Sequence, residues 1–253
     1  MYALYKLPAP KAPDAISCRN LVVHGAEATG KSTIIEALLE RLSEQNQDAN
    51  HEAPILNYAR VDAAQCITAR QLYERIVSTV AASLKLQDFA LKRCETLAQL
   101  TVSLGEMLKD TAHDPRWRFA LVLDSIDRQR DSPAALLPAL ARLSEMIPCL
   151  TCVFIVTSPP AGFLRSAGSA NLHFPPYTKQ EYVRILALSP PEPVKGTTQQ
   201  ETVDLWARFC AAVHDSLIRA ASRTLPSFKD CCSRVIPCVL TVFSQQFPMW
   251  NCW

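Results

Sequence analysis

The chain has 253 residues, of which 49% are hydrophobic and 20% are charged, and its formal net charge is +2. This composition excludes a disordered chain, and the length allows one compact domain with an appendage or two small domains. A net charge this small creates no strong field for nucleic acid, so we expect any contact with DNA to be local or shared with partners.

The apolar runs FALVLD, CVFIVTS and VIPCVLTVF are far shorter than the roughly 20 residues of a membrane-spanning helix, so no membrane segment is predicted. The first residues lack the apolar core of a secretory signal, and the ten cysteines are therefore expected to remain thiols in a reducing compartment. Cys149 and Cys152 have the spacing of half a zinc site, but no second pair completes it, so we predict core cysteines.

Strands and helices are predicted to alternate along most of the chain, after a proline-rich lead-in at residues 1–19. Strands are expected near residues 20–24, 55–61, 117–124, 150–158 and 171–174. Helices are expected near residues 32–45, 68–80, 95–110, 132–147, 179–188 and 200–223. This alternation predicts a three-layer α/β domain built on a parallel sheet.

The sequence also suggests how the chain is divided. We predict a nucleotide-binding base domain at residues 20–176, followed by a partial helical lid at 177–230, because the pattern becomes wholly helical from Thr178 onward. The tail at 231–253 is apolar and rich in cysteine without a clear helical period, and we assign it no function.

Residues 25–32 read GAEATGKS and match the phosphate-loop pattern G-x-x-x-x-G-K-[ST] between a predicted strand and a predicted helix. The glycines let the backbone curl so that its N–H groups point at phosphate oxygens, and the amino end of the helix adds partial positive charge. Lys31 is expected to reach the β- and γ-phosphates of ATP, and the Ser32 hydroxyl is expected to ligate Mg²⁺. The alternative is an ordinary glycine turn before a helix. The residues predicted to bind the nucleotide are Gly25, Ala26, Glu27, Ala28, Thr29, Gly30, Lys31, Ser32 and Thr33.

Asp124 closes the apolar run FALVLD, and a carboxylate at the carboxyl end of a central strand can hold Mg²⁺ through a water molecule. An aspartate that only caps a turn is the alternative. Hydrolytic members of this broad class usually carry a glutamate at the next position, but here the residue is Ser125, whose hydroxyl cannot act as a base at neutral pH. Asp127 is expected to face a loop instead of replacing that glutamate. The sequence therefore predicts nucleotide binding with weak or absent hydrolysis.

Three further residues are candidates for sensing the nucleotide. Thr157 and Ser158 end the next predicted strand, where a hydroxyl can sense a γ-phosphate, although polar residues are also common where a strand leaves the core. Arg165 follows in a predicted surface segment and is a candidate arginine finger for a neighbouring subunit, with an ordinary surface arginine as the alternative.

The phosphate loop, the strand ending at Asp124, the strand ending at Thr157 and Ser158, and the helical region occur in an order that resembles the AAA+ ATPases. Finer features, in residues 121–147, 153–159 and 173–188, resemble subunit 5 of the eukaryotic origin recognition complex. That family carries a leucine-proline helix after the aspartate strand and an aromatic-proline segment at the start of its lid. The resemblance covers about residues 20–225.

The resemblance implies a sheet of strand order 5-1-4-3-2 and an ATP-binding subunit of a nuclear, hetero-oligomeric ring of origin recognition complex subunits. ATP would then be mainly structural and would stabilise assembly at replication origins. Members of this family continue into further helical and winged-helix regions that are not recognisable here, so we expect contact with DNA only through the complex. The lead-in also lacks the helix that usually packs near the adenine, which leaves recognition of the base open.

Two other functions stay open at this point. An active, clamp-loader-like AAA+ ATPase would show turnover that depends on Lys31 and Asp124, and Ser125 argues against it. A P-loop signalling switch or small-molecule kinase is the other alternative, and a kinase should carry an arginine-rich lid, whereas residues 176–225 are not unusually rich in arginine.

Overall fold

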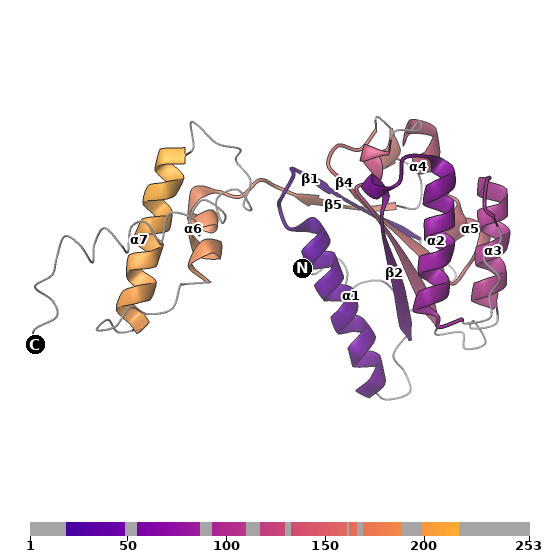
Figure 1. The fold of residues 1–253 in the computed structure, drawn as a ribbon, viewed down its shortest axis with the longest axis horizontal. Helices are drawn as coiled ribbons and strands as arrows, with labels where there is room; N and C mark the ends of the chain where they lie inside the picture. Colours follow the sequence, from indigo (N-terminus) through magenta and orange to yellow (C-terminus); the bar gives the residue numbers. More distant parts are fainter. Residues whose placement is uncertain are drawn as a thin grey trace, which may run out of the picture. The chain divides into compact units, whose positions relative to one another are not determined.

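A computed structural model describes residues 19–48, 55–86, 93–109, 117–129, 133–160, 162–165, 169–188 and 199–217. The chain divides into two units, of which the first contains residues 1–26 and 30–174 and the second contains residues 27–29 and 175–253. Each unit is described by itself (Figure 1). The predicted lead-in, apart from Arg19, and the predicted tail at 231–253 lie outside the described residues, and the finer domain boundaries remain predictions.

The first unit is built on a parallel sheet whose five described strands follow the order β2-β3-β4-β1-β5. This is the predicted order 5-1-4-3-2 read from the opposite edge, so the predicted topology is confirmed. The register pairs Asp62 of β2 with Asp124 of β3 and Asp124 with Ile155 of β4, so these strands end at one edge of the sheet. The strands are β1 (Asn20–Gly25), β2 (Leu56–Asp62), β3 (Arg118–Asp124), β4 (Leu150–Val156) and β5 (Ser169–Phe174).

Helices cover both faces of this sheet, which confirms the three-layer α/β fold (Figure 1). On one face, a core cluster joins Ile35 and Leu39 of α1 to Val23, Val122 and other sheet residues. On the other face, a larger cluster joins the sheet to the remaining helices of the unit. The helices are α1 (Lys31–Asp48), α2 (Ala69–Ser83), α3 (Leu97–Lys109), α4 (Pro133–Ala141) and α5 (Leu143–Met146).

The single helix predicted over residues 132–147 is wrong, because the structure breaks it at Arg142 into α4 and α5. The Ala141 carbonyl accepts hydrogen bonds from Asn20 Nδ2 and Ser144 Oγ, both at 3.0 Å, and the Arg142 N–H bonds to the Ala139 carbonyl at 3.3 Å. Side chains therefore divert a carbonyl that would otherwise continue the helical ladder. A contact from a residue 121 positions away cannot be seen in the local pattern.

Cys152 lies fully buried in the core, as predicted, with its Sγ 3.8 Å from the Leu140 carbonyl oxygen. Burial raises the pKa of its thiol to about 12, which makes it unreactive at neutral pH. Cys149 is half-buried and packs against the same core cluster. Among the described residues, no three histidine, cysteine or acidic side chains form a group able to hold a metal ion.

The second unit contains α6 (Lys179–Ala187) and α7 (Gln199–Leu217). Thr178 and Glu181 form a reciprocal capping box that starts α6, while Trp206 donates its indole N–H to the Leu186 carbonyl at 2.9 Å. Leu186, Trp206 and Cys210 are buried together and hold the two helices against each other. Residues 218–223 of the predicted second helix lie outside the described residues.

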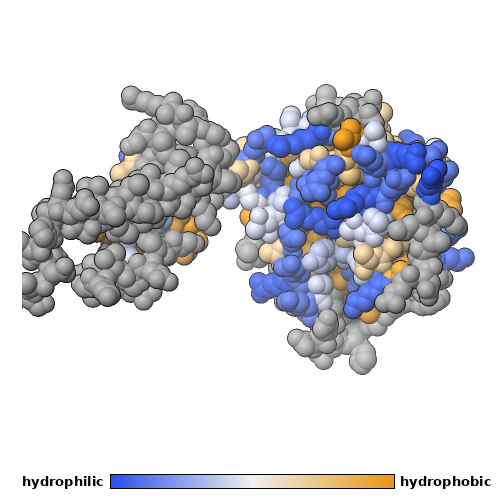
Figure 2. Space-filling view, in the orientation of Figure 1, coloured by the Kyte–Doolittle hydropathy of each residue, from blue (hydrophilic) through white to orange (hydrophobic). Residues whose placement is uncertain are grey.

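On the face of the first unit seen in Figure 2, the described residues are mostly polar, with hydrophobic side chains in scattered places. Exposed large hydrophobic residues include Ile67, Val102 and Met146, which belong to separate segments of the first unit. None of the described helices combines the length and the apolar character needed to cross a bilayer.

Gly25 gives the first testable prediction, because its φ is +147° and a Cβ atom built on it would lie 2.1 Å from the Phe174 carbonyl oxygen. Gly25→Ala should therefore lower the free energy of unfolding by about 2 kcal/mol or more. Gly105→Ala is the matched control, because nothing lies within 4 Å of a Cβ atom there. In the middle of α3 this change should stabilise the chain by about 0.5–1 kcal/mol. Chemical denaturation measures both, and equal effects of the two changes would contradict this account.

Candidate functional site

The phosphate-loop motif joins the end of β1 to the start of α1, as predicted. Gly25, Ala28 and Gly30 have φ values of 147°, 55° and 78°, and the Ile34 N–H donates to the Gly30 carbonyl at 2.9 Å to begin the helix. Backbone segments that mix right- and left-handed conformations in this way form concave nests of N–H groups that suit anions. The sequence pattern thus corresponds to a curled loop at a helix amino end, which is the local geometry that a phosphate needs.

The Lys31 ammonium group is buried against this loop, with 7% of the residue exposed. Its Nζ atom donates to the carbonyl oxygens of Gly25 at 2.8 Å and Ala26 at 2.6 Å. These neutral acceptors hold the lysine over the loop. Phosphate oxygens are stronger acceptors for an ammonium group, so a bound nucleotide can replace them.

A histidine pair lies on the strands beside the loop. His24 of β1 and His173 of β5 are paired in register, and their ring centroids are 4.9 Å apart. Burial, His173 and Lys31 together lower the pKa of His24, in that order of importance. His24 is therefore neutral at physiological pH, and it adds no positive charge to the neighbourhood of Lys31.

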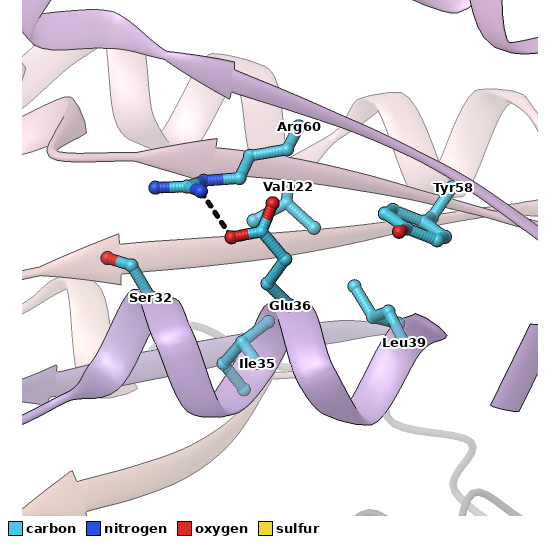
Figure 3. A pocket seen from close by; sticks show the side chains of 7 residues that line it. All are labelled: Ser32, Ile35, Glu36, Leu39, Tyr58, Arg60 and Val122. Carbon is cyan, nitrogen blue, oxygen red and sulfur yellow. Dashed lines mark hydrogen bonds and ion pairs between the residues drawn. The ribbon is translucent and has the colours of Figure 1, made fainter. Parts of the chain in front are cut away.

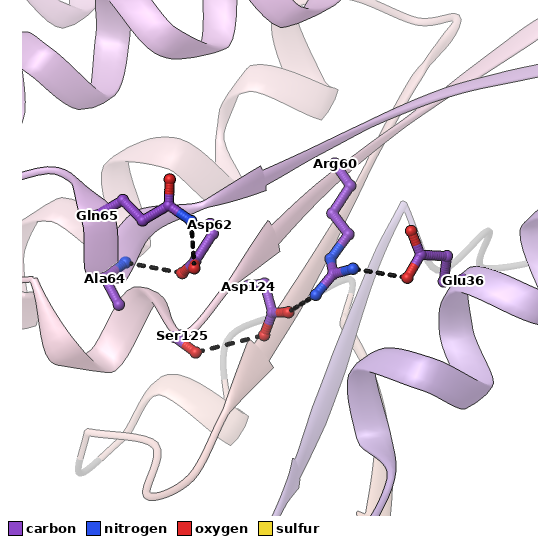
Figure 4. A network of polar contacts seen from close by, with 7 residues as sticks. All are labelled: Glu36, Arg60, Asp62, Ala64, Gln65, Asp124 and Ser125. Atoms are coloured by element: carbon purple, nitrogen blue, oxygen red, sulfur yellow. Dashed lines mark hydrogen bonds and ion pairs between the residues drawn. The ribbon is translucent and has the colours of Figure 1, made fainter.

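Asp124 lies at the carboxyl end of β3, as predicted, but its carboxylate already has a cationic partner (Figure 4). The Arg60 guanidinium donates Nη2–H to Asp124 Oδ2 at 2.7 Å and Nη1–H to Glu36 Oε2 at 2.6 Å. The Asp124 side chain is only 6% exposed, so the ion pair neutralises a buried charge. Neither Arg60 nor Glu36 was identified from the sequence, and the one available signal is a charged residue in the middle of the strand LNYARVD.

The position after Asp124 carries no base in the structure either. Ser125 has a left-handed backbone with φ of 53°, and its Oγ donates weakly to Asp124 Oδ1 at 3.4 Å. Asp127 was expected to face a loop, and its Oδ2 accepts the backbone N–H groups of Thr157 at 2.8 Å and Ser158 at 3.2 Å, which follow β4. This carboxylate therefore ties the end of β4 to the segment after β3. The second oxygen of the carboxylate, Oδ1, is buried without a hydrogen-bond partner among the described residues.

The structure gives only part of the surroundings of the candidate sensors and of the candidate arginine finger. Thr157 is half-buried and Ser158 exposed at the end of β4, and the bonds to Asp127 use their backbone N–H groups. Their sensing role stays a prediction. Arg165 ends a short 3₁₀ helix, Phe163–Arg165, but its side chain lies outside the described part of the chain, so the arginine-finger role also stays a prediction.

The second unit contributes a residue that sequence reasoning missed. Tyr177 donates its hydroxyl to the Thr29 carbonyl at 2.7 Å, and its ring meets that of Tyr182 edge to face at 5.6 Å. Thr29 is part of the phosphate-loop motif and belongs with Tyr177 to this unit. Tyr177 and Thr29 are therefore linked within the second unit.

The donor set fits ATP with Mg²⁺. A curled loop and a buried ammonium group suit phosphate oxygens, while a hydroxyl at Ser32 and a carboxylate at Asp124 are oxygen ligands of the kind that Mg²⁺ prefers. Ser32 and Glu36 are four residues apart and lie on one face of α1, next to Arg60 (Figure 3). Mg²⁺ would neutralise phosphate charge between Ser32 and Asp124.

The strand order and the loop define a P-loop α/β domain of the AAA+ type. A family model described as AAA ATPase domain matches residues 10–155, and the chain belongs to this family.

Two curated relatives make the resemblance more specific, since both are origin recognition complex subunit 5. The Schizosaccharomyces pombe protein is 25% identical over 205 residues, which are 77% of this chain and 41% of the relative. The Drosophila melanogaster protein is 25% identical over 170 residues, which are 66% of this chain and 34% of the relative. The resemblance to subunit 5 seen in the sequence is thus confirmed, and the chain spans well under half the length of these relatives.

Solved structures agree on the fold. A structure of Drosophila ORC bound to DNA matches with a TM-score of 0.61 and 20% identity over 87% of this chain and 56% of that chain. The Aeropyrum pernix ORC2 protein, in ADPNP-ADP complexes, matches with a TM-score of 0.52 and 18% identity over 78% of this chain and 50% of that chain.

Ser125→Glu tests the interpretation of the position after Asp124. If the missing carboxylate is the main defect, ATP hydrolysis should rise by about a hundredfold once a partner subunit supplies its arginine. Ser125→Gln is the matched control, because it adds the same bulk at the same left-handed backbone position without a carboxylate. Single-turnover hydrolysis with partner subunits measures both, and a Glu variant no faster than the Gln variant would contradict the interpretation.

Proposed function

We propose that this chain binds ATP as a subunit of a nuclear origin recognition complex and uses it mainly as a structural ligand that stabilises assembly on DNA at replication origins. The observation that carries the proposal is a phosphate loop with its lysine bonded over it, beside a strand in which Asp124 is followed by Ser125 instead of a glutamate. Binding and turnover need different groups, and this chain has the first set without the second.

The similar proteins support the role in the complex. Both curated relatives are named as subunit 5, and one structural neighbour is an origin recognition complex bound to DNA. We infer that the partners are other subunits of that complex in a ring, and that DNA is reached through them. The formal net charge of +2 agrees with shared contact to DNA, because it provides no strong field of its own. The ADPNP and ADP in a second neighbour support an adenine nucleotide as the ligand.

In the proposed complex, Gly25 to Thr33 cradle the phosphates, Lys31 neutralises the β- and γ-phosphates, and Ser32 with Asp124 holds Mg²⁺. Thr157 or Ser158 senses the γ-phosphate, and Arg165 reaches a nucleotide on a neighbouring subunit. The active-ATPase alternative requires a base for the attacking water, and a serine at position 125 opposes it. The switch or kinase alternative gains no support from a particular residue of the described sites.

Lys31→Ala tests ATP binding directly. Loss of the charge-assisted bonds to phosphate, worth roughly 1.5–3 kcal/mol, should weaken ATP binding about ten- to a hundredfold. Lys179→Ala is the control for removing a lysine, since Lys179 lies on α6 and is ion-paired with Asp215 at 2.6 Å. Equilibrium binding of labelled ATP measures both. If the Lys31→Ala variant and the unaltered chain bound ATP with equal affinity, the proposal of a phosphate site at this loop would be contradicted.

Assembly tests the structural role of the nucleotide. Mixed with the other subunits of an origin recognition complex, the chain should co-elute with them in ATP or in a non-hydrolysable analogue, and less so without nucleotide. Lys31→Ala should reduce the co-eluting fraction about as much as omitting ATP does. Assembly that depends on neither the nucleotide nor Lys31 would contradict a structural role for ATP.

A further inference from the structure

A pair of histidines lies on two neighbouring strands at the end that leads into the phosphate loop. His24 of β1 and His173 of β5 are paired in register, with their ring centroids 4.9 Å apart and their ring planes tilted by 39°. His24 is half-buried, His173 is exposed, and the residue after His24 is Gly25, the first of the phosphate loop. The fold therefore places an imidazole that can accept a proton one residue from the loop that is predicted to hold phosphates.

The charged neighbours of His24 are cations. On one side of His24, β4 contributes the apolar Val156. Among the described residues, the titratable groups that act on the pKa of His24 are His173 of β5 and Lys31 of α1. Burial is the largest cause of the lowered pKa, followed by His173 and then Lys31. The free chain therefore keeps His24 neutral at neutral pH, because a proton there would be partly desolvated and would face other positive charges.

Lys31 connects the electrostatics of His24 with the position of the phosphates. Its Nζ atom donates to the carbonyl oxygen of Gly25, the residue next to His24, at 2.8 Å. The ammonium charge reaches His24, since it lowers the pKa of that imidazole. Phosphates bound to the same ammonium group would act on His24 over a comparable distance. Their negative charge exceeds the single positive charge of Lys31, even when Mg²⁺ offsets part of it, so they would favour a proton on His24.

We propose that ATP binding at the phosphate loop is coupled to the uptake of a proton by His24, so that the chain binds ATP more tightly as the pH falls below neutrality. The inference rests on the proposed function, since it requires that the phosphate loop binds ATP. His24 contributes through its charge, and Lys31 remains the residue that bonds to the phosphates.

The direction of the pH dependence follows from comparing the two states. At a pH well above the pKa of His24 in either state, the imidazole is neutral throughout and the ATP affinity does not depend on it. As the pH falls below the pKa that His24 has in the complex, the complex holds a proton that the free chain lacks, so the affinity rises. The gain ends once the free chain is protonated too, below its own lowered pKa.

The first test measures the dissociation constant for labelled ATP in excess Mg²⁺, from about pH 8 to about pH 5.5. Over this range, the affinity of the unaltered chain should rise about three- to tenfold more than that of a His24→Gln variant, which corresponds to a rise of about half a unit to one unit in the pKa of His24. The comparison removes the titration of ATP itself, because both proteins bind the same nucleotide. Parallel pH profiles would overturn the inference. If neither protein binds ATP at any pH, the proposed function itself fails, which is a separate and recognisable outcome.

His173→Gln is the matched control, because it removes the other imidazole of the pair and leaves His24 in place. The gain in affinity should persist in this variant and move to higher pH, since His173 is one of the causes that lower the pKa of His24. Loss of the gain in His173→Gln, together with its retention in His24→Gln, would assign the proton to the other histidine and overturn the inference.

An NMR titration of the His24 ring in the unaltered chain keeps the test decisive if the variants prove unstable in thermal unfolding. The pKa of His24 should rise by about half a unit to one unit when ATP and Mg²⁺ are added. Adenosine is the control ligand, because it lacks the phosphates that carry the effect. A pKa that stays constant or falls with ATP, or one that rises equally with adenosine, would overturn the inference.

Discussion

The parallel register of the central strands is the constraint on which the candidate site depends. Because β1, β3 and β4 run in the same direction and are paired side by side, the phosphate loop, Asp124 and Thr157 emerge at one edge of the sheet. Ligands of open parallel sheets bind at the carboxyl ends of the strands for this reason. Each of these strands is buried on both faces, so hydrophobic packing holds the register.

The polar contacts at the carboxyl ends of these strands suit charge neutralisation better than proton transfer. Each charged side chain here has partners within the chain. Lys31 is bonded to loop carbonyls, Asp124 to Arg60, and Asp127 to the backbone just beyond β4. Each of these bonds can stabilise an ATP-ready geometry before the nucleotide arrives. A general base needs an available lone pair and basicity at neutral pH, and the Ser125 hydroxyl lacks that basicity. The site thus has the phosphate loop and the aspartate strand of a P-loop domain, with a serine after the aspartate.

Much of this could be predicted from the sequence, because the signals are local. The spacing of GAEATGKS predicted the loop and the start of the helix, and the continuous apolar runs indicated the positions of the buried strands. The strand order came from the family resemblance, since nothing in the residues alone orders a parallel sheet. The pair of Arg60 and Asp124 could not be predicted, because the two residues are 64 positions apart and meet only through the register of β2 and β3.

The other differences have the same physical origin. The break at Arg142 depends on the Asn20 amide, and the position of Asp127 depends on backbone N–H groups just beyond β4, so both arise from long-range contacts. A local pattern gives the propensity of a segment, whereas tertiary hydrogen bonds decide where a helix stops or which way a carboxylate points. The residues that sequence reasoning missed are those whose role is created by the assembled sheet.

The chemical state of the bound nucleotide tests the central claim most directly. The full chain would be incubated in excess over labelled ATP with Mg²⁺ present. The reaction would then be quenched, and the bound nucleotide would be separated and identified. The account predicts that the bound label is recovered as intact ATP over many hours. Recovery of the label as ADP, with no ADP formed by the Asp124→Asn variant, would contradict the account. It would identify the chain as a hydrolase.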